Sequence, residues 1–141
     1  MASLAQLREG LAVRLRTIPV LTVHPQVPES ITPPVAVITP GFEGEPCIRF
    51  DSTMARGADD FLFTVTLLVS MADDRSGQEE LDAYLDGTGD RSIKAVIEAD
   101  PSLGDLVHFA HVREARNYGP QTWGRDEARY VGVDFAVEIT A

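Results

Sequence analysis

The hydrophobic pattern of the chain predicts a β-sheet with one face buried against helices. In residues 61–71 every second side chain is large and apolar, which predicts a strand with a buried face. These side chains are Phe61, Phe63, Val65, Leu67 and Val69. The opposite set mixes leucines with threonines, so this strand is expected inside the sheet and partly covered on both sides. Residues 130–139 alternate between apolar odd positions and mostly small or polar even positions, which is typical of a half-solvated strand.

Three further segments have the features of amphipathic helices. Residues 3–16 carry leucines at intervals of three and four, behind Ser3 as the predicted N-cap. A second helix is predicted to begin with Ser76 as its cap, and a third to begin at Asp90 or Ser92. We expect the N-terminal helix and this central helix pair to close the inner face of the sheet.

The remaining strands follow from alternation and from the positions of proline. Residues 21–27 predict a short or edge strand because a proline interrupts them, and residues 35–39 predict a strand that enters the sheet. Residues 107–116 predict another strand. Its alternation slips between Phe109 and Val112, as it does at a β-bulge.

Two segments have no hydrophobic period. Residues at about 40–60 predict a long loop, and residues 117–125 predict a turn. The expected fold is therefore α+β: a single domain over residues 1–141 with a mainly antiparallel sheet of about four to five strands. The N-terminal helix and the central helix pair pack against this sheet.

The composition of the chain bears on its number of domains, its binding partners and its location. With 141 residues, of which 44% are hydrophobic, the chain fits one well-packed domain. Its formal net charge of −10 disfavours a protein that grips nucleic acid through its phosphates, since such binding uses clustered Lys and Arg. No apolar run approaches the ~20 residues that span a bilayer, so we expect no membrane role. The absence of a signal-peptide pattern and the single Cys47 favour the cytoplasm or an assembly built there.

The sequence predicts no catalytic residue, no cofactor site and no metal site. His108 and His111 would point to opposite faces of a strand and could share a metal only across a bulge. No thiol-protease signature surrounds Cys47, which favours a small hydrophobic role for it. The acidic pairs at 59–60 and 73–74 could bind a hard cation or act as acid and base. The preferred interpretation is that the first pair keeps a strand end soluble and the second favours a helix N-terminus.

Several stretches that together span nearly the whole chain carry a resemblance to a known family. They are LREGLAVRLRTIP at 7–19, SITPPVAVITP at 30–40, DSTMARGADDFLFTVTLLVSMADDRSGQEELDAYLD at 51–86, RSIKAVIEADPSLGD at 91–105 and VREARNYG at 112–119. In the order of its predicted elements and in the sequence of these stretches, the chain resembles the small tail-terminator and head-to-tail connector proteins of long-tailed bacteriophages, especially those of actinobacterial hosts. No mechanistic motif contributes to the likeness, which lies in the overall layout.

The resemblance implies a non-enzymatic virion protein that is assembled in the host cytoplasm. Such a protein forms a ring, expected to be hexameric, that caps the tail tube, ends its polymerisation and joins it to the head connector. Its implied partners are its own copies, the tail-tube protein and the head-to-tail connector proteins, while genomic DNA passes through the lumen without specific binding. Two alternatives stay open: a neck or connector protein of the head side, and a small α/β enzyme or ligand-binding protein. An enzyme should show a deep pocket with perturbed titratable groups.

A ring subunit needs extended segments that reach a neighbour, and the two aperiodic segments are the candidates. The residues expected at the subunit or tail-tube interface are Phe42, Arg49, Met54, Arg56, Tyr118 and Trp123. We expect the 40–60 loop to become ordered against a neighbouring subunit. An acidic subunit is compatible with a DNA conduit, because a lumen that repels phosphate lets DNA slide.

Overall fold

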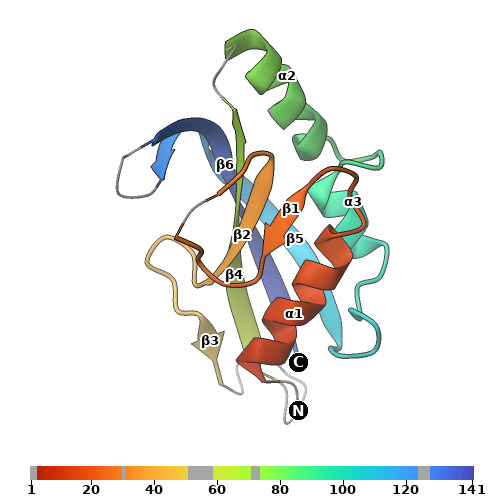
Figure 1. Ribbon diagram of the computed structural model, residues 1–141. Coiled ribbons are helices and arrows are strands. Elements are labelled where there is room, and N and C mark those ends of the chain that lie inside the picture. Colours follow the sequence, from red (N-terminus) through yellow and green to blue (C-terminus); the bar gives the residue numbers. More distant parts are fainter. Residues whose placement is uncertain (1–2, 30, 51–58, 71–73, 124–127) are drawn as a thin grey trace.

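The computed structural model describes residues 3–29, 31–50, 59–70, 74–123 and 128–141. These residues form helices α1 (Leu4–Leu15), α2 (Asp74–Leu85) and α3 (Ile93–Glu98). They also form strands β1 (Thr22–His24), β2 (Val35–Pro40), β3 (Ile48–Arg49), β4 (Asp60–Ser70), β5 (Phe109–Trp123) and β6 (Ala128–Thr140). The elements lie together as a single unit with the helices gathered beside the sheet (Figure 1).

The strands join in one mixed sheet, which confirms the predicted α+β class. The strand order is β1-β2-β4-β6-β5, and β3 pairs with the end of β4. β1 runs parallel to β2, and every other pairing among the described strands is antiparallel. The sheet has six strands rather than four to five, because two residues of the predicted 40–60 loop pair with β4 as β3.

The helices cover one face of the sheet, which is called the inner face below. The apolar side chains of β4 at positions 61, 63, 65, 67 and 69 and those of β6 at positions 131, 133, 135, 137 and 139 are buried in one core, as predicted. Leu7, Leu11 and Leu15 of α1 enter the same core. The start of α1 is fixed by a capping box, in which the Gln6 N–H donates to Ser3 Oγ and the Ser3 N–H donates to Gln6 Oε1.

Of the two serines predicted as N-caps of the central helices, one caps its helix and the other does not. Ser92 is the N-cap of α3, where its Oγ accepts a hydrogen bond from the Ala95 N–H at 3.1 Å. Ser76 does not cap α2, because the helix already includes Asp74. The sequence of this region offers several acidic and hydroxyl residues that suit an N-cap, so the pattern alone could not select among them.

The predicted turn at 117–125 is wrong as far as Trp123, because β5 continues through it. Asn117, Gly119 and Pro120 are turn-forming residues, but here they lie on an edge strand. Pro120 is tolerated because an edge strand does not need every N–H for a ladder. Asn117 and Gly119 have positive φ angles, 60° and 145°, at a shift in register between Arg116 and Gly119. A second shift lies between Val112 and Glu114, slightly beyond the bulge that the sequence predicts.

Two glycines that face each other let the β5–β6 hairpin curve over the sheet. Gly119 pairs with Gly132, and beyond this pair the end of β5 and the start of β6 bend over at the upper left of Figure 1. A Cβ atom on Gly132 would lie 2.5 Å from Leu68 Cδ2 and 2.7 Å from the Leu67 carbonyl oxygen, so the close approach of β4 requires glycine there. Beyond the bend, Trp123 packs against a small cluster on the face opposite the helices.

Candidate functional site

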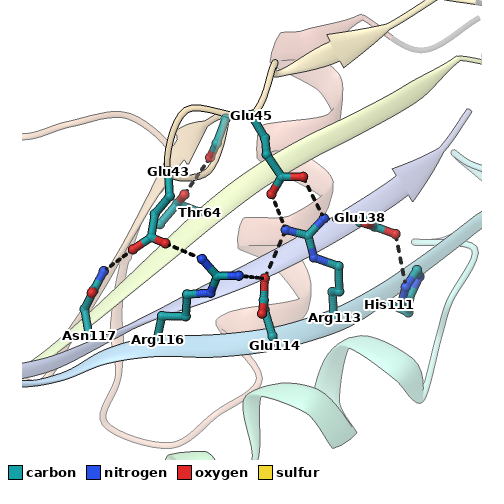
Figure 2. Close-up of polar contacts among 10 residues, drawn as sticks. Glu43, Glu45, Thr64, His111, Arg113, Glu114, Arg116, Asn117 and Glu138 are labelled. Carbon is teal, nitrogen blue, oxygen red and sulfur yellow. Dashed lines mark hydrogen bonds and ion pairs between the residues drawn. The ribbon is translucent and has the colours of Figure 1, made fainter.

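The face of the sheet opposite the helices, called the outer face below, carries the most organised set of polar contacts in the described chain. At one end Val35, Val37 and Leu68 form a buried cluster, against which Trp123 and Tyr130 pack. The middle of this face is polar. At the other end a turn of the chain folds back onto the sheet, and charged residues of β5 surround it (Figure 2).

The turn comprises residues 41–45 and follows β2 directly. Gly41 and Gly44 have φ angles of 86° and 83°, a conformation that glycine adopts without strain. The Gly41 N–H donates to the Leu62 carbonyl oxygen at 2.7 Å, and the Glu45 N–H donates to the Phe42 carbonyl oxygen at 2.9 Å. These bonds bring the Phe42 side chain down onto β4 and β6.

Phe42 is the anchor of this turn. Its side chain is 2% exposed and lies in a small buried cluster with Leu62 and Ala136. The guanidinium carbons of Arg113 and Arg116 lie 5.7 Å and 5.5 Å from the centre of its ring. At these distances a cation is attracted to the face of the aromatic ring, so the two arginines cover Phe42 from the solvent side.

The same two arginines form ion pairs with the two glutamates that follow Phe42 in the turn. Arg116 Nη1 lies 2.6 Å from Glu43 Oε2, and Arg113 contacts both carboxylate oxygens of Glu45. Asn117 Nδ2 donates to Glu43 Oε1 at 2.7 Å, so this carboxylate accepts from two side chains of β5. Figure 2 shows the four charged side chains and Asn117 meeting between the turn and the strand. We call Glu43, Glu45, Arg113 and Arg116 the charge clamp.

Hydrogen bonding keeps the charge clamp ionised. Bonds from Asn117 and then Arg116 lower the pKa of Glu43. The bond from Arg113 lowers the pKa of Glu45, and in return it raises the pKa of Arg113. All four groups are therefore charged near neutral pH.

Neighbouring polar groups connect the charge clamp to β6. Arg113 Nη1 donates to Glu138 Oε1 at 2.8 Å, and His111 Nε2 lies 3.3 Å from the other oxygen of that carboxylate. Asp134 accepts hydrogen bonds from Thr66 at 2.9 Å and from Asn117 at 2.8 Å. Glu138 and Asp134 thus both have partners within the chain. Such contacts are typical of a network that stabilises the fold.

A recess of about 110 Å³ lies beside the clamp. It is lined by Glu45, Pro46, Arg49, Asp60, Phe61, Leu62, Arg113, Glu138 and Thr140. Pockets that enclose small organic ligands usually measure about 300–1,000 Å³, so this recess is small for such a ligand. No group of three or more His, Cys, Asp or Glu residues in the described part of the chain is arranged to hold a metal ion.

The predicted interface residues fall in different places. Phe42 is buried under the clamp, and Arg49 lies in β3 and lines the recess. Tyr118 projects to the helix side, where its hydroxyl donates to Asp82 Oδ1 of α2 at 2.7 Å. Trp123 lies on the outer face beyond the glycine bend. Met54 and Arg56 lie outside the described residues, and whether any of the six contacts a neighbour stays a prediction.

Sequence reasoning missed the charge clamp itself. The V-R-E-A-R segment at 112–116 places basic residues close together on a strand, which is the one available signal. Their partners, Glu43 and Glu45, are about 70 residues away in the chain, and no local period relates them.

A comparison with protein-family models finds no family that matches the chain, and a comparison with curated proteins finds no relative. In the described residues, no helix is long and apolar enough to cross a membrane.

Proposed function

We propose that the chain is a structural virion protein of a long-tailed bacteriophage. It forms a ring, expected to be hexameric, that caps the tail tube, ends tube polymerisation and joins the tube to the head connector. The proposal starts from the resemblance in sequence layout. The observation that supports it best is the outer face, where side chains hold two segments against the sheet, the 41–45 turn and the end of β5 at Trp123. A surface of this kind suits a scaffold subunit.

A closed ring of identical subunits needs two different surfaces on each subunit, because neighbours meet head to tail. Pairing through the long edge of β5 is disfavoured, since two register shifts and Pro120 interrupt that strand. In addition, Glu98 of α3 accepts the outward Val112 N–H at 3.2 Å and so blocks part of the edge. We therefore expect ring contacts to be made by side chains, of which Phe50 is a candidate because it is 74% exposed.

The charge of the chain is consistent with a DNA conduit. A net charge of −10 repels phosphate, so genomic DNA would pass through the lumen without specific binding. The implied partners remain the tail-tube protein and the connector proteins of the head, and the implied location is the virion after assembly in the host cytoplasm.

Sedimentation with and without purified tail tubes tests this function. We expect the isolated protein to be a monomer, or a monomer in equilibrium with rings, and to cosediment with tubes as rings visible at their ends by electron microscopy. A neck protein of the head side would instead bind portal-bearing heads and leave the tubes unbound. Failure to bind either particle would overturn a role in virion assembly and favour the ligand-binding alternative.

A further inference from the structure

The 41–45 turn is attached to the sheet by few contacts, and most of them are accessible to solvent. Among the residues that the structure describes, the buried cluster around Phe42 contains only Leu62 and Ala136 besides Phe42 itself, and it is separate from the main core. The side chains of the charge clamp are 28% to 50% exposed. Exposed ion pairs are weakened by salt and by competing charges. Segments with few buried contacts are the ones that open without unfolding of the whole domain.

The ends of the turn define a unit that can move by itself. The Gly41 N–H donates to the Leu62 carbonyl oxygen at 2.7 Å, and the Leu62 N–H donates to the Cys47 carbonyl oxygen at 2.9 Å. These two bonds hold the chain on both sides of the turn against the same residue of β4. Between them, the glycines at 41 and 44 tolerate changes of backbone angle. Opening of residues 42–45 therefore leaves β2 and β3 in place.

We propose that the charge clamp is a latch: it keeps the turn closed over the outer face in the free subunit, and it opens when competing carboxylates of a second copy engage Arg113 and Arg116. Opening exposes Phe42, Leu62 and Ala136, which then contact that copy. The assembly half of this inference rests on the proposed ring function. A second copy suits the role because the chain contains 22 acidic and only 12 basic residues, so its surface offers mostly carboxylates.

Amide hydrogen exchange measured by NMR tests the latch in the isolated protein. The Glu45 N–H reports the turn because it bonds to the Phe42 carbonyl oxygen, and the Leu62 N–H reports the anchor at β3. In the double variant Arg113→Gln/Arg116→Gln we expect exchange at Glu45 to accelerate by about tenfold or more, with little change at Leu62. Raising the salt concentration from about 0.05 M to 0.5 M should act in the same direction in the wild-type protein.

The matched control is Arg16→Gln, which removes an exposed ion pair with Glu9 on α1. It should leave the exchange at Glu45 unchanged. A double-mutant cycle of Glu43→Gln and Arg116→Gln adds a second check, since two members of one latch should give effects that are less than additive. Unchanged exchange at Glu45 in the clamp variant, or equal acceleration at Glu45 and Leu62, would overturn the latch.

The assembly half is tested by ring formation as a function of protein concentration. In the presence of tail tubes, Glu43→Gln/Glu45→Gln should form rings at a lower concentration than the wild type, because it removes the ion pairs that close the turn and leaves Arg113 and Arg116 available to the second copy. Adding Phe42→Ala to that variant should cancel the gain. If the wild type forms rings and Glu43→Gln/Glu45→Gln needs the same or a higher concentration, regulation by the latch is wrong. If the wild type forms no rings at all, the ring function and this half of the inference fail together, and the exchange result still decides whether the latch exists.

Discussion

Replacing Gly132 by alanine should destabilise the protein because the added methyl group has no room. It would lie 2.5 Å from Leu68 Cδ2 and 2.7 Å from the Leu67 carbonyl oxygen, and 3.2 Å from Gln121 Cδ. The leucine side chain can move, but the carbonyl oxygen belongs to the central strand β4 and can shift only with the sheet. Overpacking of this kind costs about 1–3 kcal/mol. The smaller entropy of the unfolded chain with alanine offsets about 0.4–1 kcal/mol.

The expected net loss in the free energy of unfolding is therefore about 1–2 kcal/mol. Urea unfolding followed by circular dichroism measures it, and the fluorescence of Trp123 reports the end of the hairpin beyond the bend. Gly87→Ala is the matched control, because no atom of the described residues other than its chain neighbours lies within 4 Å of a Cβ atom at Gly87. That variant should stay within about 0.5 kcal/mol of the wild type.

A Gly132→Ala protein as stable as the wild type, with unchanged tryptophan fluorescence, would refute the reasoning. It would mean that β4 and β6 do not approach as closely at this point as the structure places them. Loss of stability in both glycine variants would also count against it, since the effect would then not depend on the contact with β4.

Three other perturbations test the fold and the electrostatics. Val65→Asp or Phe135→Asp should abolish folding as seen by circular dichroism, because each places an unpaired charge in the main core; a cooperative unfolding transition in either variant would contradict this. Ser3→Ala should cost about 1 kcal/mol in urea unfolding through loss of the capping box, and no change would argue against the cap. The pKa values of Glu43 and Glu45 are lowered on folding, so their contribution is present above the usual carboxyl pKa and is lost as the pH falls through the lowered values. The ring-proton NMR signals of Phe42 should therefore shift as the turn opens in acid, and signals that stay constant until global unfolding would contradict it.

Much of the sheet could be predicted because its strands bury one face. The alternation in β4 is set by the requirement that residues such as Phe63 and Val65 reach the helix side, and this requirement is visible in a single segment. The end of β5 could not be predicted in the same way. Asn117, Gly119 and Pro120 have local preferences for turns, and pairing with β6 overrides them.

The contacts on the outer face could not be predicted from the sequence for a different reason. Phe42 is a single apolar residue among glycines and glutamates, so the local pattern contains no sign that it would be buried. Its burial depends on Leu62 and Ala136 of distant strands and on two arginines further along the chain. Contacts at such separations have no local period, and they appear only once the sheet has been built.

The length of tail tubes assembled in the presence of this protein is the most direct test of the central claim. Tail-tube subunits should be polymerised with and without the wild-type chain and measured in the electron microscope. A terminator should give shorter tubes, with a ring at one end and no further growth when fresh subunits are added. Tubes with the same length distribution and bare ends in both samples would contradict termination.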